Sequence, residues 1–319
     1  MKRATLERIQ VWISLAAISA GLLLGTHWPS LQPTMRALLW PTLIALLFVT
    51  FTQVPLLHIR AALRDLRFTG IAAFGNFVAL PLLVWALVQW VPADPPLRLG
   101  IFLVLMAPCT DWFITFTQLG SGDTPRAIAV TPINLMLQLA LLPIYIWLSM
   151  GMDHLGVGKA LAPALWSAAP IVLIPLVAAA LSERWLESRD DGRRLRERIA
   201  WWAVPLLGLV VFLIAAAEVD ALRETPTGWQ SAILVFVAFL LLAAVLAKML
   251  ARIAKLPAHQ GRTLAFSFGT RNSFVVLPIA LSLPPGWEAA ALIIVIQALV
   301  ELLGMLVYLW AVPRHLFRQ

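Results

Sequence analysis

The chain has 319 residues, of which 61% are hydrophobic and 13% charged, and its mean hydropathy is +0.87. The apolar residues form long continuous runs rather than stripes along one side of a helix, which indicates a membrane protein and excludes a soluble globular one. The net charge of +8 does not indicate a nucleic-acid partner, because such a partner needs a basic face outside the membrane segments.

Ten apolar runs are long enough to cross a bilayer, since about 20 mostly apolar residues span its hydrocarbon core. They lie at about 9–26, 37–57, 69–90, 98–119, 127–150, 161–181, 199–217, 229–249, 262–283 and 288–311. The sequence therefore predicts an all-α integral membrane protein with ten transmembrane helices and no soluble domain. The first run continues without a small-x-small cleavage site, so we interpret it as a span rather than as a signal peptide.

Lysine and arginine favour cytoplasmic loops and so predict the orientation of the chain. With the N-terminus inside, 19 basic residues fall on the cytoplasmic side and four on the outer side. We therefore expect a multi-pass protein of the cell (inner) membrane with both termini in the cytoplasm.

The two halves of the chain look like copies of one unit. Adding about 160 to the limits of the first five spans gives numbers close to the limits of the last five. Residues 1–150 and 161–319 are therefore predicted to be two five-helix repeats. Because five is odd, the second repeat enters the membrane from the opposite side, and such inverted repeats are frequent in secondary transporters.

The fourth span is interrupted by APCTDWF at 107–113. Pro108 lacks a backbone donor and disfavours helix at the residue before it, whereas Thr110 and Asp111 favour the start of a new helix. We expect two half helices here.

The ninth span is interrupted by FSFGTRNSF at 266–274. Gly269 is followed by Asn272 and Ser273 as candidate caps of a new helix, and the sequence offset from Asp111 to Asn272 is 161. Interrupted helices at matching places in two halves predict a transport site near the membrane midplane, where the free backbone groups line a wet cavity. We expect the two interrupted helices to cross there.

Three charged residues lie well inside spans, namely Asp111, Arg271 and Glu301. Each costs about 3 kcal/mol or more at mid-bilayer, so each is expected to face the protein interior and to be paired or functional. We predict an ion pair between Arg271 and Asp111 at the crossing, with helix capping as the alternative for Asp111. The guanidinium could also take the place of a coupling cation.

Glu301 follows Gln297 by four residues, so both side chains lie on one helix face. Asn134 and Gln138 occupy the equivalent places in the first half, each at a sequence offset of 163, which predicts one polar pair from each half around the crossing. A buried, unpaired carboxylate can gain and lose a proton. We favour a proton carrier over a buried hydrogen-bonding acid for Glu301.

Cys109 is the only cysteine. A lone cysteine is usually a small buried apolar residue, but at an interrupted helix its soft sulfur also suits a thiophilic ion or metalloid. No buried histidine cage and no phosphate-binding loop accompany it, so we expect no cofactor and a gradient as the energy source.

Four segments resemble the bile acid/sodium symporter superfamily and, within it, most of all the arsenite-efflux permeases. They are APCTDWFITFTQLGSGD (107–123), TPINLMLQLALLPIY (131–145), FGTRNSFVVLPIAL (268–281) and VELLGM (300–305). The resemblance implies a panel of helices 1, 2, 6 and 7, a core of helices 3, 4, 5, 8, 9 and 10, and an elevator-like or rocking movement between them.

The resemblance also implies residue roles. In the arsenite branch a cysteine in span four and a glutamate in span ten are tied to metalloid/proton antiport, and Cys109 and Glu301 match them. Where sodium-coupled relatives carry an acidic residue and a glutamine around the span-nine glycine, this chain has Ser267 and Arg271. That difference argues against a complete sodium site.

Two main hypotheses follow. The first is export of arsenite or antimonite, and the second is transport of small organic anions held by Arg271 and the N-termini of the half helices. A membrane-embedded enzyme or sensor is disfavoured, because no soluble domain and no nucleophile-base arrangement is present. The expected partners are a small inorganic or organic solute and membrane lipid. The expected solute contacts are Cys109, Thr110, Asn134, Gln138, Asn272 and Ser273, and the expected coupling or ion-pair residues are Asp111, Arg271, Gln297 and Glu301.

Overall fold

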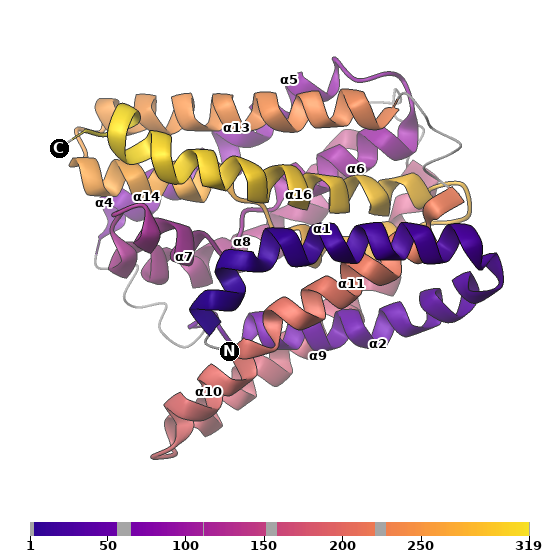
Figure 1. The fold of residues 1–319 in the computed structure, drawn as a ribbon. Coiled ribbons are helices and arrows are strands. Elements are labelled where there is room, and N and C mark those ends of the chain that lie inside the picture. The colour runs from indigo at the N-terminus through magenta and orange to yellow at the C-terminus, as the bar shows by residue number, and fades with distance from the viewer. Residues whose placement is uncertain (1–2, 56–64, 111, 151–157, 221–227, 319) are drawn as a thin grey trace.

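The computed structural model describes residues 3–55, 65–110, 112–150, 158–220 and 228–318. Its regular elements are helices, which Figure 1 shows. In chain order they are α1 (Arg3–His27), η1 (Pro29–Leu31), α2 (Gln32–Phe51), α4 (Leu66–Phe74), η3 (Gly75–Ala79), α5 (Leu80–Val88), α6 (Pro95–Met106), α7 (Trp112–Leu119), α8 (Thr124–Met150), α9 (Gly158–Glu187), α10 (Gly192–Trp201), α11 (Ala203–Ala217), α13 (Gly228–Ile253), α14 (Ala258–Gly269), α15 (Ser273–Leu281), α16 (Glu288–Ala311) and η5 (Val312–Leu316).

Within the described residues, seven helical stretches are long and apolar enough to cross a membrane. They are Pro29–Phe51, Leu66–Val88, Thr124–Leu148, Leu161–Glu187, Gly192–Ala217, Trp229–Ile253 and Glu288–Leu316. The chain is therefore an all-helical, multi-pass membrane protein. The other three predicted spans fall on α1, with a shorter apolar stretch at Trp12–His27, and on the interrupted pairs α6/α7 and α14/α15. The full set of ten spans in inverted repeats stays a prediction.

The helices pack in two groups. α1 packs on α11, α11 on α2, and α2 on α9, whereas α16 packs on α6 and α13, and α13 on α14. Figure 1 shows the first group in the lower part of the molecule and the second group in the upper part. Gly21 and Gly25 bring α1 close to α11, because an added Cβ would lie 2.4 Å from the carbonyl oxygen of Phe212 and 2.3 Å from that of Ala216. Small residues allow such close packing of membrane helices.

Two tyrosines make the same contact in the two halves of the chain. The Tyr145 hydroxyl donates to the carbonyl of Phe77, and the Tyr308 hydroxyl donates to that of Leu240, in both cases 68 residues earlier. Pro81 explains the first contact, because it has no N–H to offer the carbonyl four residues before it. The two contacts are related by a sequence offset of 163, which supports the predicted repeat.

An ion-pair cluster joins the N-terminal ends of α4, α8 and α14. Asp65 caps α4 by accepting from the Phe68 N–H at 3.0 Å and accepts from Arg126 Nε at 2.7 Å. Arg126 also binds Asp123, whose carboxylate lies 3.5 Å from His259 Nε2. The backbone bond from Phe68, followed by Arg126, lowers the pKa of Asp65. This stabilisation is therefore present above the usual pKa of aspartate and is lost as the pH falls through the lowered value.

The close contact between α1 and α11 predicts that Gly25 tolerates no side chain. Gly25→Val forces a methyl-bearing carbon against backbone atoms of α11, and such overpacking costs about 1–3 kcal/mol. Thermal unfolding of the detergent-solubilised protein measures the effect. Gly70→Val is the matched control, since an added Cβ at Gly70 meets nothing within 4 Å. Equal unfolding midpoints for the two variants would contradict the prediction.

Candidate functional site

The two interrupted helices meet at their breaks and bond to each other through the backbone. α6 ends at Met106 and α14 ends at Gly269, and the chain is extended at Ala107 and Thr270. The Cys109 N–H donates to the carbonyl of Thr270 at 3.2 Å, and the Asn272 N–H donates to the carbonyl of Ala107 at 2.8 Å. Each break thus satisfies backbone groups freed by the other, as a site inside a membrane requires. The prediction of two interrupted helices is confirmed.

This pair of bonds also indicates the register between the two halves. Pro108 and Arg271 face each other as an isolated antiparallel bridge, and the sequence offset between them is again 163. At that offset Cys109 corresponds to Asn272, and the two backbone bonds exchange with each other. The bonds therefore favour 163 rather than the predicted 161, which paired Asn272 with Asp111. Asp111 itself lies outside the described residues.

At the start of α15, side chains add further hydrogen bonds to the crossing. Asn272 is the N-cap of α15, accepting from the Val275 N–H at 3.4 Å, and its amide donates to the Thr110 hydroxyl at 3.2 Å. Ser273 donates its hydroxyl proton to the Gln297 side-chain oxygen at 2.7 Å. The predicted cap at Asn272 is confirmed, whereas Ser273 is the first helical residue and binds α16 instead.

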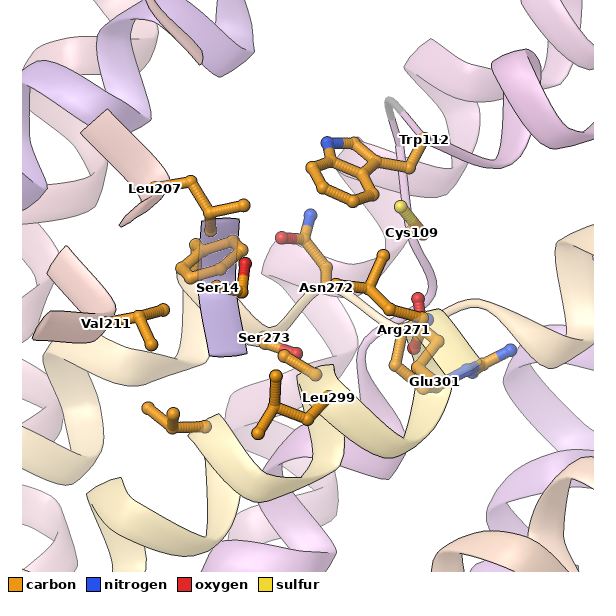
Figure 2. A pocket seen from close by; sticks show the side chains of 14 residues that line it. Ser14, Cys109, Trp112, Leu207, Val211, Arg271, Asn272, Ser273, Leu299 and Glu301 are labelled. Carbon is orange, nitrogen blue, oxygen red and sulfur yellow. The ribbon is translucent and has the colours of Figure 1, made fainter. Parts of the chain in front are cut away.

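A small cavity of about 40 Å³ lies between the crossing and the α1/α11 pair. One wall contains Ser14, Leu207 and Val211, and the facing walls contain Cys109, Trp112, Asn272, Ser273 and Glu301. Figure 2 shows the Cys109 sulfur and the Asn272 amide beside the Trp112 indole, with Leu207 and Val211 opposite. The first residues of α7 and α15 border this space, so the positive ends of two helix dipoles face it. A volume of this size holds a few water molecules or a solute of a few heavy atoms.

Glu301 lies directly under the crossing on α16 and is 6% exposed. Its Oε2 accepts from the Arg271 backbone N–H at 2.8 Å and from the Gln297 amide at 2.7 Å. Glu301 is therefore hydrogen-bonded, unlike the unpaired carboxylate considered from the sequence. The physical reason is the break itself, since it leaves the Arg271 N–H without a helical partner and α16 supplies one.

Arg271 is 3% exposed and is among the residues that line the cavity, and its guanidinium end extends from the crossing away from the cavity. Its terminal nitrogens donate to the carbonyls of Leu105, Ser267 and Phe268 and to the amide oxygen of Asn76. The predicted ion pair with Asp111 involves a residue outside the described ranges. Asn76 was missed in the sequence, although it is the polar residue in the middle of the third span and lies in η3, a π-helical turn of the kind that often marks functional sites.

Not every predicted solute contact lines the cavity. Thr110, a predicted solute contact, stands outside the lining and accepts from the Asn272 amide. Gln297, a predicted coupling residue, also stands outside it and accepts from the Ser273 hydroxyl. Asn134 and Gln138 are each 1% exposed on α8 and stand outside the lining, and their side-chain nitrogens have no hydrogen-bond partner among the described residues. Ser14 of α1 does line the cavity and carried no signal in the sequence beyond being polar within an apolar run.

Comparison with known families matches residues 40–225 to the Sodium Bile acid symporter family. The chain belongs to this family. The match covers more than half of the chain, and the family consists of secondary transporters of small solutes and not of enzymes. The interrupted, crossing helices are the kind of element that such transporters use to hold a solute.

Two curated proteins resemble this family member over much of its length. The Arsenical-resistance protein Acr3 of Corynebacterium glutamicum is 26% identical over 239 residues, which are 68% of this chain and 64% of that protein. The chain thus spans less than two thirds of that relative. An uncharacterised protein of Pseudomonas aeruginosa is 26% identical over 273 residues, or 83% of this chain and 81% of its own.

The cap at Asn272 predicts a measurable contribution to the stability of this transporter. Asn272→Ala removes the oxygen that accepts from Val275 and is expected to cost about 0.5–2 kcal/mol. Asn272→Ser keeps a capping oxygen and is expected to recover most of the loss, since serine caps almost as well. Thermal unfolding in detergent compares the three proteins. An alanine variant as stable as the wild type would show that the break does not depend on this cap.

Proposed function

We propose that this transporter exports arsenite or antimonite in exchange for protons, with Cys109 as the transient ligand of the metalloid. The observation that carries the proposal is the small cavity at the crossing. Cys109, the only cysteine of the chain, and Glu301, whose carboxylate is hydrogen-bonded, both line it. Similarity to an arsenical-resistance protein supports the same solute class. Soft sulfur prefers such thiophilic elements to hard cations.

Capture of the metalloid requires one ligand exchange and no redox step. In trihydroxy-arsenic(III), the bond from Cys109 sulfur to arsenic forms as one arsenic–oxygen bond breaks, and the thiol proton leaves with that hydroxyl as water. Hydrolysis reverses the step and releases the solute. A single thiolate holds the metalloid weakly compared with a multi-thiolate site, which suits a carrier that must also release it.

Glu301 is proposed as the proton site. It borders the same cavity as Cys109 and takes hydrogen bonds from the Arg271 backbone and from Gln297. Both donors favour the ionised carboxylate, whereas burial favours the protonated one. Opposed influences of this kind allow a small change in the surroundings, such as binding of a solute, to move the proton.

The alternative of a small organic anion has less support. That hypothesis uses the Arg271 guanidinium to hold a carboxylate, but its terminal nitrogens are bonded to carbonyls and to Asn76 on the side away from the cavity. Pockets for larger organic ligands usually measure about 300–1,000 Å³, far above this cavity. Geometry therefore favours the smaller, uncharged inorganic solute.

We further propose that the α1, α2, α9 and α11 group acts as the panel and that the group with the crossing moves against it. The cavity lies between the two groups, so such movement exposes it to one side or the other. The excess of lysine and arginine on one side of the predicted spans supports placing both termini in the cytoplasm.

Replacing Cys109 by serine tests the metalloid ligand. The wild-type chain is expected to restore arsenite tolerance to a sensitive host, and Cys109→Ser is expected to reduce that tolerance to the level of the empty vector. Because Cys109 is the only cysteine, arsenite should also slow labelling of the wild-type protein by a thiol reagent. Tolerance that survives in the serine variant, at equal membrane abundance, would rule out the thiol as ligand.

Replacing Glu301 by glutamine tests proton coupling. Glutamine keeps one oxygen for the bonds from Arg271 and Gln297 but cannot exchange a proton. In proteoliposomes, arsenite flux through the wild type is expected to rise with an opposing proton gradient, and flux through Glu301→Gln is expected to be independent of it. A variant that still responds to the gradient would exclude Glu301 as the proton site.

A further inference from the structure

The Arg271 guanidinium fills a cage of four neutral oxygen atoms beside the crossing. Nη2 lies 3.0 Å from Asn76 Oδ1, 3.1 Å from the Ser267 carbonyl and 2.8 Å from the Phe268 carbonyl. Nη1 lies 3.3 Å from the Leu105 carbonyl. Three oxygens thus surround a single nitrogen, which has only two hydrogens to share among them.

Among the described residues, the atoms that accept from the guanidinium are neutral oxygens, and their arrangement makes the cage negatively polarised. Leu105 lies in the last turn of α6, and Ser267 and Phe268 lie in the last turn of α14, so two helix C-termini point at the guanidinium. Asn76 is oriented by donating its amide proton to the Ser267 hydroxyl at 2.9 Å. Among the residues that the structure describes, no carboxylate forms a salt bridge with this guanidinium, and Glu301 binds the Arg271 backbone instead.

A set of oxygens of this kind is better suited to a spherical cation than to arginine. Arginine is usually matched by a planar carboxylate or phosphate. Carbonyl oxygens and the C-terminal ends of interrupted helices are the groups that bind monovalent cations in channels and secondary transporters. Sodium, which the family description names, does not fit here, because each cage oxygen already accepts from Arg271.

We infer that Arg271 is a built-in cation that occupies a monovalent-cation site and makes transport by this chain independent of sodium. The guanidinium neutralises the two helix ends permanently, so no sodium or potassium ion has to enter or leave with the solute, and proton exchange at Glu301 is unaffected. The inference concerns coupling and holds for either hypothesis about the solute. It also predicts that removing the guanidinium opens the site to an inorganic cation.

Thermal unfolding of Arg271→Ser tests the inference without any transported solute. Sodium or potassium chloride, compared with choline chloride, is expected to raise the unfolding midpoint of this variant and to leave that of the wild type unchanged. A cation at ten times its dissociation constant stabilises the folded state about 11-fold, which corresponds to about 2 °C for a protein of this size. Arg271→Gln is the second variant, since glutamine leaves a smaller void.

Arg262→Gln is the matched control. Arg262 lies on α14, is buried like Arg271 (5% exposed), and donates to the carbonyls of Phe317 and Ser121, but it stands away from the crossing. This variant is expected to respond equally to all three salts. The inference is wrong if neither Arg271 variant distinguishes sodium or potassium from choline, or if the wild type responds as they do. It is also wrong if neither variant folds in any salt, because the guanidinium is then a structural cross-link that no ion replaces.

Discussion

The rest of the site depends on two backbone hydrogen bonds, one from Cys109 to Thr270 and one from Asn272 to Ala107. A helix that stops inside a membrane leaves amides and carbonyls that lipid cannot satisfy. Here two such stops lie against each other, so each supplies part of what the other lacks. The Arg271 N–H, which the second break also frees, is satisfied by the Glu301 carboxylate.

The crossing places the positive and the negative ends of the helix dipoles on different sides. The N-terminal ends of α7 and α15 border the cavity, and the C-terminal ends of α6 and α14 converge on the Arg271 guanidinium. In the proposed function, the oxygens of a solute in the cavity therefore meet the positive ends of the dipoles, while Arg271 neutralises the negative ends. Arg271 takes part in the backbone bridge, in the cage and in the bond to Glu301. A displacement of Arg271 in any one of these contacts therefore alters the geometry of the other two.

The position of the cavity connects the site to the movement that we propose between the two helix groups. Its wall from α1 and α11 consists of Ser14, Leu207 and Val211. The apolar side chains of Leu207 and Val211 can slide past the facing wall without breaking hydrogen bonds. In contrast, α1 and α11 are packed against each other at Gly21 and Gly25, where no space is left. Tight packing within this group and a loosely bonded face toward the crossing are what a rigid unit moving past another requires.

The sequence alone determined the membrane class, the interrupted helices and the polar residues near them. Long apolar runs, Pro108, and the polar residues after Gly269 act locally, because each changes what its own stretch of backbone can do in lipid. The cap at Asn272 follows from the same local rule. The family resemblance based on these segments was also confirmed.

Only the tertiary structure decided how these residues meet. The pairing of Pro108 with Arg271, the bonds to Glu301, the cage around Arg271 and the exclusion of Asn134 and Gln138 from the cavity lining all depend on contacts between distant helices. Asn76 lies 195 residues from Arg271 in the chain. No local pattern around Asn76 predicts that its partner is Arg271. Local rules predict where a helix stops, whereas the packing of the whole bundle decides which group each freed atom finds.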